Sequence, residues 1–314
     1  MPYLPIILII AAILILVVIV ISYICYFMAF HVPKTAAPEP EEVNLPKGDI
    51  YEPYWEQMTK WVEETKVTPC EEMSITSFDG LTLRGRYYEY AKDAPVELMF
   101  HGYRGSADRD LCGAVQRCFL LGHNALLVDQ RACGQSGGHI ITFGVKERRD
   151  CQSWVSHIIH HFGEDVKIIL TGISMGAATV TMAAGEPLPK NVIGVLADCG
   201  YTSAKDIIQR VVRQMKLPPK LAYPFVKLGA KLFAHFDLEE FPPIEAVKHC
   251  KLPIIFIHGE NDTFVPCEMS RRNFEACTTK KKKLFTVPLA GHGLSYLLDT
   301  EGYMQTVRDF FHGS

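Results

Sequence analysis

Short apolar runs alternate along this chain with helical patterns, and this alternation constrains the fold more than any other feature. The runs are rich in Val, Ile and Leu and cover residues 96–100, 124–129, 166–172, 192–198, 252–259 and 283–290. Such runs are typical of strands that are buried on both faces of a parallel sheet. Helical patterns lie between most of them, at residues 109–122, 145–162, 175–186, 267–278 and 294–312. The chain is therefore predicted to form an α/β fold with a mostly parallel central sheet and helices on both faces.

Two further segments precede this series. Residues 72–78 and 81–91 have strand-like composition and flank Asp79-Gly80, a dipeptide typical of hairpin turns. Residues 50–66 carry apolar side chains at helical spacing and predict a short helix that packs on the domain. The folded region therefore begins before the parallel sheet does.

One connection between predicted strands is too long for an ordinary crossover. Residues 203–248 contain helical stretches near 204–216 and 220–235, which are interrupted by prolines. Insertions above the carboxyl ends of strands often form lids or pocket walls. We therefore predict a helical cap insertion at about 203–248. Its apolar side chains could line a pocket, although we expect most of them to pack the insertion onto the body.

The first 31 residues form a separate region. No charged side chain occurs from Ile6 to Phe30, and a helix of this length would measure about 37 Å, which is enough to cross a bilayer. A signal peptide would carry basic residues and a shorter apolar core. We predict a retained transmembrane anchor at residues 4–31, a Pro- and Glu-containing linker at 32–49 and a folded domain at 50–314.

Charge and cysteine usage indicate the surroundings of the folded domain. Lys34 and Lys47 follow the anchor and no basic residue precedes it, which favours a single-pass membrane protein with a cytoplasmic domain. Ten cysteines occur, and they show neither disulfide-framework spacing nor a CxxC pair. This usage is typical of a reducing compartment and indicates no zinc site. A net charge of −3 with scattered basic residues excludes a nucleic-acid-binding surface.

Ser174 is the candidate nucleophile. It lies between Gly172 and Gly176 in a Gly-x-Ser-x-Gly motif that directly follows a predicted strand and directly precedes a predicted Ala-rich helix. This context matches the nucleophile elbow, in which a sharp turn raises the serine hydroxyl above the sheet and the helix points free N–H groups at a developing oxyanion. The alternative is a chance match in a glycine-rich turn.

A serine hydroxyl becomes nucleophilic at neutral pH beside an oriented base. His292 follows the last predicted strand in the sequence AGHG, and Asp262 follows the strand before it in HGENDTFVP. The order Ser, acid, His and the position of each residue at the carboxyl end of a strand predict a triad of Ser174, Asp262 and His292. Asp198, after the preceding strand, and Glu260 remain alternatives for the acid.

An oxyanion hole requires two converging N–H groups. The motif predicts one from Met175, the residue after the nucleophile, and one from Tyr103 in the loop HGYRG after the strand at 96–100. His101 is expected to have a structural role at the start of that loop. Arg104 could bind a substrate carboxylate, although we expect it to be exposed to solvent.

Several of these motifs carry a resemblance to a known family. The segments HGYRGS, DQRACGQSGG, GISMGA, HGENDTFVP and AGHG occur in this order, and over residues 70–312 the chain resembles the α/β-hydrolase superfamily, in particular its serine-aminopeptidase and bacterial cinnamoyl-esterase-like group. The resemblance implies the α/β-hydrolase fold and the same triad. It also implies that Asp129 and Arg131 organise the neighbouring loop. Substrate is not implied, because this fold carries many activities.

The combined expectation is a membrane-anchored serine hydrolase that cleaves a small carboxylic ester through an acyl-enzyme, with no cofactor and no metal. The anchor and the apolar insertion make an amphiphilic ester one option. Two alternatives stay open: a serine peptidase for short peptides, and a hydrolase-fold protein that binds without catalysis. The peptidase would need an acidic group for the free amine, and none is identified from the sequence.

Overall fold

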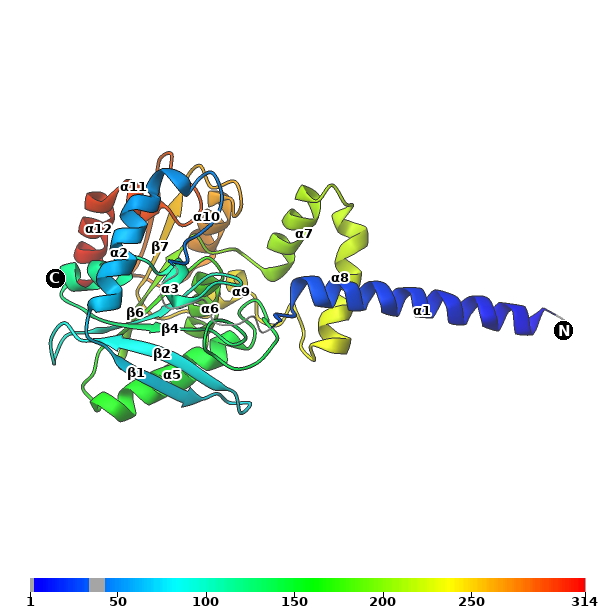
Figure 1. Cartoon of the computed structure of the whole chain (residues 1–314), viewed down its shortest axis with the longest axis horizontal. Coiled ribbons are helices and arrows are strands. Elements are labelled where there is room, and N and C mark those ends of the chain that lie inside the picture. Colours follow the sequence, from blue (N-terminus) through cyan, green and yellow to red (C-terminus); the bar gives the residue numbers. More distant parts are fainter. Residues whose placement is uncertain (1–2, 34–42, 314) are drawn as a thin grey trace.

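A single eight-stranded sheet forms the centre of the molecule, and the computed structural model describes residues 3–33 and 43–313 (Figure 1). The strand order is β1-β2-β4-β3-β5-β6-β7-β8. β1 and β2 pair antiparallel, as do β2 and β4, and the remaining neighbours are parallel. The strands are β1 (Glu71–Thr76), β2 (Thr82–Tyr88), β3 (Val96–Phe100), β4 (Asn124–Val128), β5 (Ile168–Ile173), β6 (Val192–Asp198), β7 (Ile254–Gly259) and β8 (Lys282–Val287).

Helices cover both faces of this sheet. Successive strand residues point to opposite faces, so in β3 Leu98 and Phe100 contact the core under α5 and α6, whereas Met99 contacts the core under α4. The second face continues under α12 with Val307. These helices are α2 (Trp55–Val67), α3 (Ala107–Asp110), α4 (Ala114–Leu121), α5 (Glu147–Phe162), α6 (Met175–Ala184), α9 (Pro243–His249), α10 (Cys267–Ala276), α11 (Ser295–Leu298) and α12 (Thr300–His312), with a 3-10 turn, η1 (Glu52–Tyr54), before α2.

The predicted fold class is confirmed, with local differences that have physical causes. The helical pattern at 109–122 is divided between α3, which ends at Asp110, and α4, because Gly113 before α4 adopts φ +81°, a left-handed conformation that a continuous helix cannot contain. The pattern at 294–312 is divided at Asp299, whose side chain accepts a hydrogen bond from Gly302 N at 2.9 Å and caps α12.

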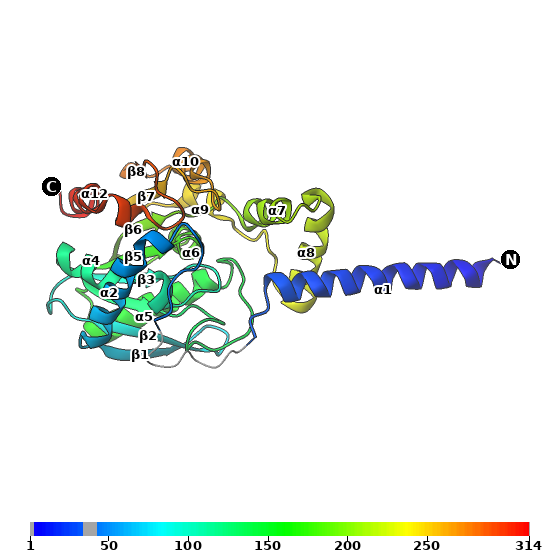
Figure 2. The same ribbon diagram turned by 45° about the horizontal axis from the view of Figure 1, so that its top comes forward.

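The amino-terminal helix α1 (Leu4–Ala29) projects from the folded body as a long straight rod (Figures 1 and 2). Among the described residues it is the one helix whose length and composition suffice to cross a membrane, and its mean hydropathy is 3.7. Its side chains are mostly exposed, with Ser22 as the buried exception. Of the predicted linker, residues 34–42 lie outside the described part of the chain.

The predicted insertion contains two helices that stand apart from the sheet, α7 (Ala204–Gln214) and α8 (Pro219–Phe233) (Figure 1). Its last helix, α9, packs instead against α6. Helix α8 crosses α1 near the carboxyl end of α1 in both views (Figures 1 and 2). The two backbones approach closely at Gly229, where an added Cβ would lie 2.5 Å from the carbonyl oxygen of Ser22.

The carboxyl end of α1 is joined to the body by main-chain hydrogen bonds. Ile141 N donates to Phe30 O at 2.9 Å, and Val32 N donates to His139 O at 2.8 Å. The Phe30 side chain is fully buried between Phe143 and Phe236. The residues that directly follow α1 are therefore packed against the folded domain.

Candidate active site

Ser174 occupies a strained turn between β5 and α6. Its φ is +56° and its ψ −114°, a region that side chains rarely adopt. The flanking glycines make the turn feasible: a Cβ on Gly172 would lie 2.2 Å from the main chain of Gly176, and one on Gly176 would lie 2.0 Å from the Phe100 carbonyl oxygen. The Gly-x-Ser-x-Gly spacing thus follows from close packing of β3, β5 and α6.

Three predicted residues meet at the carboxyl edge of the sheet. His292 Nε2 lies 2.9 Å from Ser174 Oγ, and His292 Nδ1 lies 2.6 Å from Asp262 Oδ2. A carboxylate only accepts hydrogen bonds, so Nδ1 carries the proton and Nε2 is left as the acceptor that faces the serine. This tautomer is the one a general base requires.

Asp262 is held as an anion by its surroundings. Its Oδ1 accepts hydrogen bonds from Phe264 N at 2.9 Å and Val265 N at 2.8 Å. Burial raises the pKa of this carboxyl group, but hydrogen bonds from His258 and His292 outweigh burial and lower the pKa to about 2. Asp262 is therefore ionised wherever His292 acts as a base.

His258 is a contributor that the sequence reasoning missed. It is fully buried, and its Nε2 lies 2.8 Å from Val265 O and 3.2 Å from Asp262 Oδ2. Both oxygens are acceptors, so Nε2 donates, and His258 and His292 bond to the same oxygen of Asp262. The available signal was its place four residues before Asp262, at the end of a buried strand.

The two rival acids do not bond to His292 in the described structure, although Asp198 lines the same cavity. Glu260 is about two-fifths exposed and bonds to Arg271 at 3.2 Å and Thr286 at 2.7 Å. Asp198 is buried, and its Oδ1 has no hydrogen-bond partner among the described residues. Burial raises the pKa of Asp198 to about 6. Neither carboxylate bonds to His292 in the described structure, whereas Asp262 does.

The two predicted oxyanion donors belong to segments close to the nucleophile. Met175 is the first residue of α6, where N–H groups have no partner within the helix. Tyr103 follows β3 and lines the same cavity as Ser174. The Tyr103 hydroxyl donates to Ala29 O at 2.9 Å, which attaches this loop to the end of α1.

Arg104, in the same loop, is exposed as expected, and it also makes hydrogen bonds. Its guanidinium donates to the carbonyl oxygens of Met28 at 2.9 Å and His31 at 2.8 Å. These carbonyls belong to the end of α1, where main-chain acceptors have no helical partner, so Arg104 caps that helix.

His101, Asp129 and Arg131 make the structural contacts that were expected of them. His101 Nε2 accepts a hydrogen bond from Gln130 N at 2.9 Å. Asp129 accepts from Ala107 N at 2.9 Å and Gln135 N at 2.9 Å. Arg131 pairs with Asp150 at 2.6 Å and Asp79 at 2.9 Å. The DQRACGQSGG segment is therefore a scaffold for the loops around Ser174.

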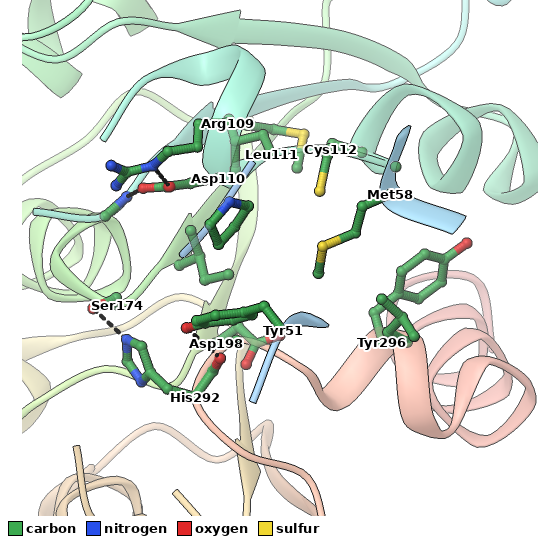
Figure 3. Close-up of a pocket in the computed structure, with 18 of the residues that line it drawn as sticks. Tyr51, Met58, Arg109, Asp110, Leu111, Cys112, Ser174, Asp198, His292 and Tyr296 are labelled. Carbon is green, nitrogen blue, oxygen red and sulfur yellow. Dashed lines mark hydrogen bonds and ion pairs between the residues drawn. The ribbon is translucent and has the colours of Figure 1, made fainter. Parts of the chain in front are cut away.

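A cavity of about 510 Å³ opens at Ser174 (Figure 3). No residue of α7 or α8 lines it, so the insertion does not form the wall of this pocket. Its wall comes instead from the segment around α2, from the region of α3 and α4, and from α11. Its apolar lining includes Met58, Trp61, Leu111, Cys112, Ala114, Ile173, Leu196, Tyr296 and Leu297. The helix at 55–67 therefore contributes to a pocket as well as packing on the domain, which the sequence did not reveal.

Tyr51 is a second missed residue. Its hydroxyl donates to His292 O at 3.0 Å, and its ring lies in the cavity beside His292 (Figure 3). Burial raises the pKa of this phenol, so it stays protonated and remains a donor. No sequence signal links Tyr51 to His292, because 241 positions separate them.

One group of side chains has ligand atoms close enough to hold a metal ion among the described residues: Cys199, Asp262 and His292, within 4.8 Å of one another. Burial raises the pKa of Cys199 well above its usual range, which keeps the thiol protonated and a poor ligand. Asp262 and His292 are bonded to each other. Asp262 and His292 therefore fit the hydrogen-bond chain to Ser174 better than a metal site.

The sheet order, the strained serine turn after β5 and the site at the carboxyl edge give the chain the α/β-hydrolase fold, as the resemblance implied. No protein-family model matches the chain.

Comparison with known proteins agrees with this class. The chain is 27% identical over 239 residues to the uncharacterized protein YqkD of Bacillus subtilis, across 75% of this chain and 77% of that protein. It is 27% identical over 226 residues to protein bem46 of Schizosaccharomyces pombe, across 71% of this chain and 69% of that protein. An uncharacterized membrane protein of Saccharomyces cerevisiae is 25% identical over 190 residues, across 60% of this chain and 61% of that protein.

Solved structures show the same fold. The esterase Pf2001 of Pyrococcus furiosus superposes with a TM-score of 0.64 at 24% identity, across 79% of this chain and 93% of that chain. Est1E of Butyrivibrio proteoclasticus, solved with ferulic acid bound, superposes with a TM-score of 0.57 at 19% identity, across 76% of this chain and 97% of that chain.

Proposed function

We propose that this chain is a membrane-anchored serine hydrolase of carboxylic esters. The observation that carries the proposal is the continuous hydrogen-bond chain from Asp262 through His292 to Ser174, with distances of 2.6 and 2.9 Å. The structural neighbour Pf2001 is an esterase and Est1E binds ferulic acid, which supports this substrate class, and the resemblance in sequence supports the same residues.

In the proposed reaction, Ser174 Oγ attacks the ester carbonyl carbon while His292 Nε2 takes the hydroxyl proton. The negative charge on the carbonyl oxygen is stabilised by the N–H groups of Tyr103 and Met175. His292 then protonates the leaving alcohol, and an acyl-enzyme on Ser174 remains. A water molecule, deprotonated by His292, releases the carboxylic acid. Asp262 stays ionised throughout and stabilises the imidazolium.

The cavity favours an apolar acyl group. Met58, Leu111 and Tyr296 provide apolar walls of the cavity that opens at Ser174 (Figure 3), and its volume of about 510 Å³ lies within the usual range for small-molecule pockets. Two acids line the cavity, Asp110 and Asp198. Asp110 is paired with Arg109 at 2.6 Å and accepts from Gly102 N at 2.9 Å, which makes it a poor partner for a peptide amine. Burial raises the pKa of Asp198 to about 6, so this carboxyl group is ionised less readily than a free aspartate. We therefore favour ester over peptide hydrolysis.

The proposed organisation is an anchor at 4–31, a linker at 32–49 and a hydrolase domain at 50–314 that carries the insertion at about 203–248. Two observations support an anchor. α1 is apolar and exposed along its length, and its last turn is held by the domain through Arg104 and Tyr103. The balance of basic residues supports a cytoplasmic domain.

A fluorophosphonate probe tests the nucleophile. Full-length protein in detergent should be labelled, whereas Ser174→Ala should not be, because the probe forms a covalent bond only with an activated serine. Loss of labelling in Ser203→Ala, a helix-capping serine outside the cavity, would show a folding effect instead. Equal labelling of wild type and Ser174→Ala would refute the assignment.

A substrate panel separates the alternatives. Aryl esters with acyl chains of graded length are compared with aminoacyl anilides, and the expected result is hydrolysis of esters with a chain-length optimum. Activity on anilides alone would identify a peptidase. A folded protein that takes the probe at no serine and hydrolyses neither series would be a binding protein.

A further inference from the structure

We propose that the exposed surface of α7, α8 and the turn between them is a second membrane contact that binds the anionic headgroups of the leaflet where α1 ends. This inference rests on the proposed membrane anchor and not on the hydrolase activity. We call this surface the cap surface. It is formed by the exposed residues Arg213, Met215, Lys216, Leu217, Lys220, Leu221, Lys231 and Leu232.

Contacts with α1 fix the position of α8. The backbone of α8 meets α1 at Gly229, where an added Cβ would lie 2.5 Å from Ser22 O. The ring of Phe233 packs against Tyr23 and Tyr26, with centroids 5.2 and 5.7 Å apart. Ser22 is completely buried by this contact. Helix α8 therefore sits at the level of the last two turns of α1.

That level corresponds to the membrane–water interface. About 20 residues of helix cross the hydrocarbon core, and the apolar run that starts at Leu4 reaches this length near Tyr23. Tyrosines concentrate where the hydrocarbon meets the headgroups. Helix α8 crosses α1 rather than running along it (Figures 1 and 2), so a membrane-spanning α1 would hold α8 along the plane of the interface.

The charge of this segment fits an anionic surface. Residues 203–236 contain seven basic residues and one acidic residue, an excess of six positive charges, whereas the whole chain has a net charge of −3. The basic residues are Lys205, Arg210, Arg213, Lys216, Lys220, Lys227 and Lys231. Lys205 and Lys227 pair with Glu239. Arg213, Lys216, Lys220 and Lys231 are exposed on the cap surface.

Apolar side chains lie among these charges. Met215, Leu217, Leu221 and Leu232 are between 44% and 68% exposed. Apolar side chains next to lysines, whose long stems keep the charge in the headgroup layer, are typical of helices that lie in a membrane interface. A second copy of this chain would be a poor occupant, because two such surfaces would bring equal positive charges together.

Site-specific fluorescence in the full-length protein tests this contact. An environment-sensitive dye is attached at Leu221→Cys in a background that lacks the exposed Cys70 (Cys70→Ser), and the protein is placed in nanodiscs. The discs contain either phosphatidylcholine alone or a mixture with phosphatidylglycerol, each with lipid that carries a headgroup-proximal quencher. A dye at Ser156→Cys, an exposed site on α5, is the reference position.

The expected result is strong quenching at 221 in phosphatidylglycerol discs, weaker quenching in phosphatidylcholine discs and little at 156. Replacing Arg213, Lys216, Lys220 and Lys231 with Gln should reduce quenching at 221 by at least half. A charge-matched variant with Gln at four exposed lysines elsewhere should leave it unchanged; its positions are Lys92, Lys167, Lys190 and Lys251.

Three outcomes would overturn the proposal: equal quenching at 221 and 156, equal quenching in both lipids, or energy transfer between dyes at 221 in two copies of the chain. The same readings are taken with Ser174→Ala, which has no effect on the dye if only hydrolysis depends on that serine. Failure of the hydrolase proposal is thus distinguishable from failure of the membrane contact.

Discussion

The hydroxyl of Tyr103 donates a hydrogen bond to the main-chain oxygen of Ala29 at 2.9 Å, and this bond joins the proposed oxyanion loop to the end of the proposed membrane anchor. Arg104 strengthens the junction through its bonds to Met28 and His31. The non-glycine φ of +51° at Arg104 places this loop in a conformation that needs support from its surroundings. The end of α1 and the loop after β3 are therefore one structural unit.

We expect Tyr103→Phe to lower kcat by a few-fold, with KM little changed. The variant keeps the ring and the N–H group but loses one buried hydrogen bond, worth about 1 kcal/mol. Tyr201→Phe is the matched control, since it loses a buried bond to Phe143 O of 3.1 Å that does not involve α1. Steady-state kinetics on a short soluble ester measure kcat and KM for both variants. An equal loss of kcat in both variants would contradict a specific role for the junction.

Asp262→Asn should reduce kcat by about 10⁴, because an amide at this position stabilises the wrong tautomer of His292 and does not stabilise its imidazolium cation. Asp198→Asn should retain most of the activity, since Asp198 makes no hydrogen bond with His292 in the described structure. The comparison is made on kcat in folded samples of matched melting temperature. The opposite ranking would make Asp198 the acid.

Asp198 should make stability depend on pH between about 4 and 6. Burial raises its pKa from 3.8 to about 6 in the folded state, so the folded protein binds more protons than the unfolded chain in this interval. This group stabilises the folded state at pH 4, and its contribution to the free energy of unfolding falls by on the order of 2–3 kcal/mol as the pH rises through 6. Asp198→Asn should remove this component. Melting temperatures of wild type and Asp198→Asn in detergent at pH 4.5 and 7 provide the test. An equal change with pH in the two proteins would contradict this contribution of Asp198.

Leu111→Trp should shift the preferred ester toward shorter acyl chains. Leu111 lines the apolar wall of the cavity (Figure 3), so a larger side chain reduces the space for the acyl group while the triad remains in place. Leu120→Trp is the control, because Leu120 is 63% exposed and does not line the cavity. kcat/KM is measured across the chain-length panel. An unchanged optimum in Leu111→Trp would place the acyl group elsewhere.

Glu97→Gln should lower the free energy of unfolding by about 3–5 kcal/mol, the usual cost of leaving a buried charge without its partner. Glu97 is 1% exposed and bonds to Arg117 at 2.6 Å, His123 at 2.7 Å and Thr171 at 2.9 Å. Chemical unfolding of the detergent-solubilised protein measures the effect. Glu89→Gln, beyond the end of β2, should change stability little. A loss below 1 kcal/mol in Glu97→Gln would show that the cluster tolerates a neutral residue.

The predicted strands, their alternation with helices and the three proposed catalytic residues follow from local signals. An apolar run such as residues 96–100 predicts a strand that is buried on both faces. The Gly172-x-Ser174-x-Gly176 spacing reflects a turn that admits no side chain larger than glycine at its two flanking positions. Glu97 shows the limit of this reasoning, because it lies within an apolar run and its partners are visible only when β3, α4 and β5 are assembled.

The sequence by itself determined the class of fold, the apolar amino-terminal helix and which serine, acid and histidine to examine, since each depends on residue type and on neighbours within a few positions. Only the tertiary structure decided that α2 lines the cavity and that Tyr51 and His258 support the proposed triad. It also decided that the end of α1 bonds to the proposed oxyanion loop and that α1 crosses α8. These contacts join segments that are distant in the chain. Their strength comes from desolvation and packing, which no local pattern encodes.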